Sequence, residues 1–282
     1  MNVIFRLRGT VVPRIALRMG LVGAVAAMGS VGRAYLGVDL SIPDRAHAIV
    51  GVALGLLLVF RTNASYDRFW EGRKLVGALV NACRDLARQS SSYLDGAARV
   101  RAGQLVTALY ATVRRYLRGE RDYPELASVL SDAERVRLAE VRATPLYLAQ
   151  LFSNLMSDEV RAGRLPEERL QAMDANLTKA IEAWGGAERI VRTPIPLAYA
   201  HHIKVFLVVF CLSLPLALLP TGIWFSVVGS GVVAFGFFGI DEIGVEIEDP
   251  FGYDPNDLPL DAIGERLGAD VTQITTEPGA GK

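Results

Sequence analysis

Residues 205–240 read VFLVVFCLSLPLALLPTGIWFSVVGSGVVAFGFFGI, a run without a single Asp, Glu, Lys or Arg. One membrane-spanning helix needs about 20 apolar residues, so this run predicts two short spans, 205–219 and 223–240. Pro220 and Gly222 lie between the spans and predict the turn, because proline interrupts a helix and glycine permits a reversal. Charged residues flank both ends of the run, and we therefore expect the two ends on the same side of the membrane.

The composition supports a membrane protein more than a soluble one. The chain has 282 residues, of which 51% are hydrophobic. If residues 205–240 were the buried hairpin of a soluble protein, the apolar residues elsewhere in the chain would be too few to cover that hairpin. With 30 Lys+Arg against 30 Asp+Glu, the net charge gives no reason to expect a nucleic-acid partner. Cys83 and Cys211 lie in a charged and an apolar stretch, which predicts no disulfide, and no zinc-site spacing is present.

Two earlier segments predict two more spans. Residues 15–36 are rich in Gly and Ala, which let helices approach closely in a membrane, and residues 46–60 form a shorter apolar run. Positive residues favour the cytoplasm, and they gather before the first span and in residues 61–204. We therefore expect both termini, the central region 61–204 and the segment 241–282 to be cytosolic. The arginines before or at the edge of the first span are Arg6, Arg8, Arg14 and Arg18.

The central region predicts helices and no enzyme. Apolar side chains recur there every three or four residues, and glycines mark the breaks. No nucleophile elbow, P-loop, zinc-protease or dinucleotide-binding motif is present. The adjacent His201 and His202 would point about 100° apart on a helix and do not suit one metal. The expected helices run to about Leu94, then to Leu117, and over residues 122–141, 144–163 and 166–190.

Val52, Leu56 and Phe60 are spaced by four residues and therefore form one stripe on a helix. Packing inside a helix bundle is the interpretation that periodicity alone favours. The alternative is a hydrophobic constriction, formed when copies of the helix surround an axis, which gates ions by dewetting. The stripe is followed by residues 61–74, RTNASYDRFWEGRK, whose polar groups are too many to face lipid. They must pair with each other, line water or face another subunit.

A second polar stretch follows the last span. Residues 248–261 read EDPFGYDPNDLPLD, with carboxylates or amides at positions 249, 254, 256 and 257. Oxygen-rich loops of this kind bind hard cations such as calcium. The composition is equally compatible with a solvated acidic turn.

Four stretches, in the same order, resemble the bestrophin family and in particular its bacterial homologues. They are residues 8–13 (RGTVVP), 61–74, 188–199 (ERIVRTPIPLAY) and 249–261. The resemblance implies an all-α integral membrane protein with a single domain, residues 1–282, four transmembrane helices per subunit and a helical cytosolic region. It implies a homopentameric channel of the bacterial inner membrane that conducts chloride or other anions passively. A sodium-selective channel of the same fold is the alternative.

The resemblance also implies roles for particular residues. It assigns the stripe of Val52, Leu56 and Phe60 to the pore neck, and it places a cytosolic constriction near Leu165 and Leu170. No cofactor is required, although a calcium clasp is implied for some members of the family. The clasp would use Asp254 and Asp257, the backbone carbonyls of Glu246 and Asp249, and a carbonyl near Thr10. The implied partners are further copies of the chain, the lipid bilayer and permeant inorganic ions.

Two other classes of function compete with a channel. A membrane scaffold would use the cytosolic helices to dock a partner protein. A coupled transporter would show broken helices with charged groups at the middle of the membrane, and the predicted spans contain no carboxylate.

Overall fold

The computed structural model describes residues 9–276, and within that range it contains helices and no β-strand. Arg6 and Arg8, which entered the orientation argument, lie outside the described residues. The chain divides into two compact units. Unit 1 combines the described residues up to Phe69 with Pro194–Asp257, and unit 2 combines Trp70–Thr193 with the described residues from Leu258 onward. The all-α fold predicted from the sequence is confirmed.

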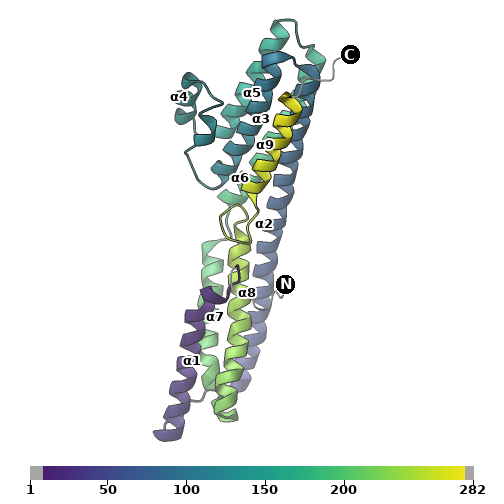
Figure 1. The fold of residues 1–282 in the computed structure, drawn as a ribbon. Coiled ribbons are helices and arrows are strands. Elements are labelled where there is room, and N and C mark those ends of the chain that lie inside the picture. Colours follow the sequence, from purple (N-terminus) through teal and green to yellow (C-terminus); the bar gives the residue numbers. More distant parts are fainter. Residues whose placement is uncertain (1–8, 277–282) are drawn as a thin grey trace. The chain divides into compact units, whose positions relative to one another are not determined.

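Four apolar helices dominate unit 1 (Figure 1), and each is long and apolar enough to cross a membrane. This number agrees with the four spans predicted from the sequence. Three of them, α1, α7 and α8, pack against one another. The fourth is the first part of α2, a continuous helix of 50 residues. The bounds are α1 Val12–Tyr35, α2 Asp44–Tyr93, α7 Leu197–Leu218 and α8 Ser230–Glu248.

A buried apolar cluster holds these four helices together. α1 contributes Ile15, α2 contributes Leu54 and Leu58, α7 contributes Leu207 and α8 contributes Phe238, and each of these side chains is at most 2% exposed. Because lipid tails are as apolar as these side chains, close van der Waals packing, and not transfer out of water, holds the membrane helices together. The outer faces of the same helices remain apolar and exposed, as a lipid environment requires.

The connection between α7 and α8 agrees with the predicted turn. A 3-10 turn, η3 Leu219–Thr221, contains Pro220. Gly222 follows it with a backbone φ of 111°, which residues other than glycine rarely adopt. A π-helical segment, η4 Phe225–Gly229, then leads into α8. The hydroxyl of Ser226 donates to the carbonyl of Pro215 at 2.9 Å, which ties the turn back to α7. Both ends of the apolar run lie together, since Lys204 Nζ is 3.9 Å from Asp241 Oδ2.

Unit 2 is built around α3, which packs against α5 and α9. The predicted helix over 122–141 is wrong in its first half, where only a 3-10 turn forms before α4. A new helix begins after Ser131 because Ser131 and Glu134 form a capping box. α9 was not expected from the sequence. The bounds are α3 Gly96–Leu117, η2 Pro124–Leu126, α4 Asp132–Glu140, α5 Thr144–Arg161, α6 Glu167–Arg192 and α9 Leu260–Thr276.

Candidate functional site

The apolar stripe of α2 lies on a face that unit 1 does not cover. Val52 is 78% exposed, Leu56 55% and Phe60 57%, whereas Leu54 and Leu58 on the opposite face are 0% and 2% exposed. Packing inside the subunit core therefore does not account for the stripe. The assignment of these three residues to a pore neck stays a prediction, because it depends on further copies of the chain.

The polar residues that follow the stripe divide between the same two faces. Asn63, Tyr66 and Asp67 are exposed and continue the uncovered face, whereas Arg61 and Ser65 are buried. The exposed face of α2 thus changes from apolar to polar after Phe60. A continuous face of this kind suits a path that leaves a dry constriction and enters water.

Arg61 forms a buried ion pair with Asp241 of α8, which sequence reasoning missed. Arg61 is 3% exposed and Asp241 is 1% exposed, and a guanidinium nitrogen of Arg61 donates to Asp241 Oδ1. Two more cations approach the second oxygen, with Arg18 Nη1 at 3.8 Å and Lys204 Nζ at 3.9 Å. Arg18 also donates to Glu242 at 3.1 Å. The pair connects α2, one residue after Phe60, to α8.

The acidic loop after α8 gathers most of the predicted calcium ligands, together with protein hydrogen-bond donors. Arg14 Nη2 donates to Asp254 Oδ1 at 2.6 Å, and Arg14 Nη1 lies 3.5 Å from Glu246 Oε2. The amide of Asn256 donates to Glu246 Oε1 at 3.0 Å and to the carbonyl of Gly9 at 3.3 Å, beside Thr10. The carboxylate of Asp254, a predicted side-chain ligand, therefore already meets a guanidinium, and the side chain of Glu246, whose backbone carbonyl is a predicted ligand, meets a guanidinium and an amide.

Asp257 lies deeper in the same loop. Its Oδ2 accepts a hydrogen bond from the Asp254 backbone N–H at 2.7 Å, and its buried Oδ1 has no partner among the described residues. Burial, followed by the nearby charges of Asp254, Asp249 and Glu246, raises the pKa of Asp257 to about 6. Among residues 9–276, no group of three or more His, Cys, Asp or Glu has an arrangement that could hold a metal ion. The calcium clasp, which would also use backbone carbonyls, stays a prediction.

The residues predicted to form a cytosolic constriction lie around the turn between α5 and α6. Gly163 adopts φ 70° at the end of α5, and Leu165 follows it with a side chain that is only 2% exposed. Leu170, in the first turns of α6, is partly exposed. Of the two, Leu170 has the side chain that the subunit leaves accessible. Both assignments stay predictions.

An ion pair stabilises this turn. Arg164 donates to both carboxylate oxygens of Glu159 at 2.7 Å, and the Glu159 backbone carbonyl accepts from the N–H groups of Arg164 and Leu165 at 3.0 and 3.2 Å. The Glu159 side chain is 9% exposed, whereas that of Arg164 is 64% exposed. The hydrogen bond from Arg164 holds the pKa of Glu159 below its ordinary value, although burial opposes this effect.

The depressed pKa of Glu159 predicts a loss of stability in acid. Its contribution is fully present above the ordinary pKa of 4.5, and it is lost as the pH falls through the lower pKa of the folded state. Between about pH 5 and pH 3, we expect the thermal midpoint of the wild type to fall more steeply than that of Glu159→Gln. Scanning fluorimetry of the detergent-purified protein measures both slopes, and parallel slopes would contradict the prediction.

The four apolar helices with an uncovered stripe define a multi-pass membrane protein. A family model described as "Bacterial/Fungal Bestrophin protein" matches residues 1–273. The chain belongs to this family, and the resemblance seen in the sequence is confirmed.

Proteins of known sequence and structure agree with this assignment. The voltage-dependent anion channel-forming protein of Nostoc sp. (strain PCC 7120) is 36% identical, over 98% of this chain and 91% of its own length. Its counterpart in Escherichia coli (strain K12) is 32% identical, over 86% of this chain and 80% of its own length. A crystal structure of a bacterial bestrophin homologue from Klebsiella pneumoniae matches with a TM-score of 0.87 and 27% identity. That match covers 94% of this chain and 99% of the Klebsiella chain.

Proposed function

We propose that this protein is a channel that conducts small monovalent anions such as chloride passively across a membrane. The observation that carries the proposal is the similarity, over nearly the whole chain, to relatives named as voltage-dependent anion channel-forming proteins. The exposed stripe of α2 supports it, because a water-filled pore needs a surface that the subunit's own core does not cover.

The channel is proposed to be a homopentamer, in which copies of α2 surround the pore. In this assembly Val52, Leu56 and Phe60 form the neck, and Leu165 or Leu170 forms a second constriction. The exposed apolar area on α2 supports the assembly, because large uncovered patches mark sites of association with protein or lipid. Cross-linking of the detergent-purified protein, followed by mass measurement of the assembly, tests the number of subunits.

Ion flux from liposomes tests the proposed activity. Purified protein, reconstituted alone, is expected to dissipate a chloride gradient, and separately imposed sodium gradients measure the competing permeability. A preference for sodium would support the cation-selective alternative of the same fold. The absence of flux of either ion would favour a scaffold or a transporter that needs a coupling ion.

Conduction is proposed to need no calcium. Arg14 already supplies a positive charge to the carboxylate of Asp254, a side-chain ligand of the implied clasp, and to that of Glu246, whose backbone carbonyl the clasp would use. We expect currents in planar bilayers to be the same with a calcium chelator and with added calcium. The variants Asp254→Ala and Asp257→Ala test whether any response to calcium comes from the acidic loop. If calcium changes the wild-type currents and either variant abolishes that response, the loop is a calcium clasp and this proposal fails.

The protein is proposed to lie in the bacterial inner membrane with both termini in the cytoplasm, and without enzymatic activity. Its partners are then the bilayer, other copies of the chain and the permeant ions, with no nucleic acid. The arginines around the start of α1 and throughout residues 61–204 support this orientation. Labelling of single cysteines introduced at Gly37 or Glu140, by a reagent that does not cross membranes, tests it in intact spheroplasts. Only the cysteine at position 37 is expected to react.

A further inference from the structure

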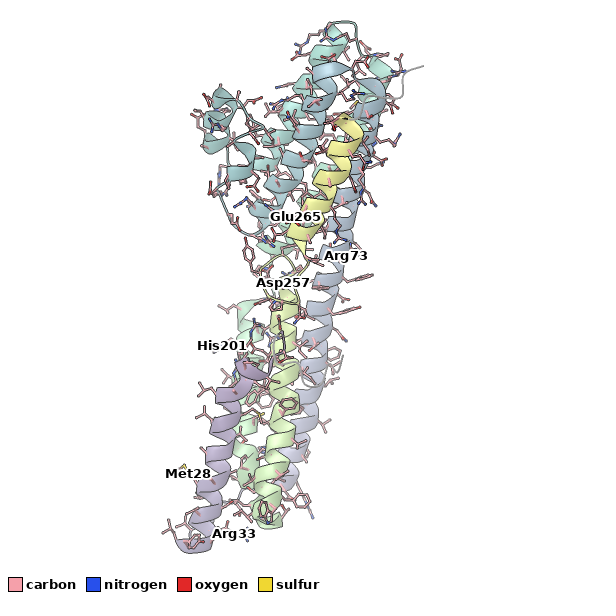
Figure 2. The ribbon with its side chains drawn as sticks, in the orientation of Figure 1. Met28, Arg33, Arg73, His201, Asp257 and Glu265 are labelled. Atoms are coloured by element: carbon pink, nitrogen blue, oxygen red, sulfur yellow. The ribbon has the colours of Figure 1, made fainter. Side chains whose placement is uncertain are left out.

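A groove between α2 and α9 in unit 2 carries three arginines. It encloses about 360 Å³. Figure 2 shows Arg73 on α2 near the start of α9, where Glu265 is labelled. The groove belongs to neither the neck, the acidic loop nor the α5–α6 turn. The lining residues used below are Arg73, Gly77, Asn81 and Arg84 from α2, with Ile263 and Arg266 from α9.

The walls of the groove are fixed by contacts between the two helices. Arg84 donates from Nε and Nη2 to Asp270 Oδ2, at 3.1 and 2.8 Å. About two turns further along α2, the hydroxyl of Ser91 donates to the carbonyl of Ile274 at 2.9 Å. α2 and α9 are thus connected beyond one end of the groove, and the arginines of both helices line the same hollow.

The positive charge of the groove exceeds its negative charge. Asp270 neutralises Arg84, but Arg73 has no ion pair or hydrogen bond to any other residue that the structure describes. Arg266 donates from Nε to the carbonyl of Ala262 in its own helix and has no carboxylate partner within residues 9–276. Glu265, next to Arg266 in the sequence, does not line the groove. Two guanidinium groups therefore remain available to an anion.

The backbone of α2 makes room for Arg73. A Cβ atom built on Gly77 would lie 3.3 Å from Arg73 Nη1, so the guanidinium lies close over the glycine. Val76 and Val80, which are 3% and 8% exposed, form an apolar part of the wall. The groove thus offers a charged region beside an apolar one.

We propose that this groove binds a phosphate-bearing anion. A guanidinium presents paired N–H donors that match two oxygens of one phosphate, and two or three such groups around one hollow favour a multiply charged ligand. The enclosed volume of about 360 Å³ is large for a monatomic ion and falls in the range of small organic ligands. The apolar wall suits the carbon-bearing part of an organic phosphate. A soluble phosphate and the headgroup of an anionic phospholipid share this chemistry.

Two binding measurements on the full-length, detergent-purified protein distinguish the sources. Inorganic pyrophosphate is titrated by calorimetry at low ionic strength, where charged contacts are least screened. Phosphatidylglycerol and phosphatidylcholine are added in parallel, and the shift in thermal midpoint is recorded. Pyrophosphate binding supports a soluble phosphate. A shift with phosphatidylglycerol alone supports a lipid headgroup.

Single variants test whether the binding of either ligand takes place in this groove. Arg73→Gln and Arg266→Gln are each expected to weaken binding by about tenfold, because each removes charge-assisted hydrogen bonds. Gly77→Leu keeps every charge but fills the groove, and it is expected to weaken binding as well. Arg161→Gln is the control, because Arg161 pairs with Asp158 on the exposed surface of the same unit. The proposal is overturned if neither ligand acts on the wild type, or if the groove variants respond like the control.

Discussion

Replacing Arg61 with Met is expected to destabilise the protein by about 3–5 kcal/mol, because it leaves the buried carboxylate of Asp241 without its hydrogen-bond partner. Arg18 and Lys204 lie 3.8 and 3.9 Å from Asp241 Oδ2, too far to replace that hydrogen bond. Thermal unfolding of the detergent-purified protein, followed by the loss of the monodisperse peak in size-exclusion chromatography, measures the effect. Arg161→Met is the matched control. Its partner Asp158 is on the surface, where an ion pair contributes about 0–1 kcal/mol.

The double variant Arg61→Met with Asp241→Leu separates two contributions to stability. One is the destabilisation caused by an unpaired buried charge, and the other is the stabilisation provided by the intact ion pair. Removing both charges leaves no unpaired ion in the core, and replacing a buried pair with apolar residues is often neutral or stabilising. We therefore expect the double variant to recover most of the stability that Arg61→Met loses. A double variant as unstable as Arg61→Met would mean that the pair itself, not the isolated charge, stabilises the helices.

The same double variant tests a role in conduction. Arg61 follows Phe60 directly, so its bond to Asp241 helps to fix the rotation of α2 and hence the direction in which the stripe points. A stable double variant with altered conductance would assign this positioning role to the pair. Wild-type conductance would limit the pair to folding.

The parts of the fold that could be predicted depend on local patterns. The absence of charge in residues 205–240 is enough to predict the α7–α8 hairpin, because the bilayer excludes charged side chains. The spacing of Val52, Leu56 and Phe60 is enough to predict a shared face. Periodicity alone could not tell a face buried in the helix bundle from one left uncovered. It favoured burial, whereas this face is exposed in the subunit.

The parts that could not be predicted depend on contacts between distant segments. Arg61 and Asp241 each follow an apolar run, and nothing in either run shows that the two residues meet. Their opposite charges at corresponding positions were a readable signal, as was the capping box of Ser131 and Glu134 that divides the predicted helix 122–141. α9 also had a signal, since Leu260, Ile263, Leu267 and Val271 recur at helical spacing.

Truncating the stripe is expected to have the largest effect on conduction. In the triple variant Val52→Ala, Leu56→Ala and Phe60→Ala, a ring of copies of α2 would be wider and less apolar at its narrowest point. Ions would then shed less of their water, and the current rises about tenfold for every 1.4 kcal/mol by which the barrier falls. Single-channel recording in planar bilayers, at equal protein density, measures the change. Because all three side chains are more than half exposed in the subunit, the truncation leaves no cavity in its core.

The matched control truncates equally exposed side chains of another membrane helix. Leu17, Leu21 and Met28 of α1 are 78%, 50% and 71% exposed, and their replacement by Ala removes comparable apolar volume. If α2 lines the pore, this control conducts like the wild type while the α2 triple variant leaks. Equal currents from the two triple variants would instead show that the exposed face of α2 meets lipid or another helix, and the neck would then have to be sought elsewhere in the chain.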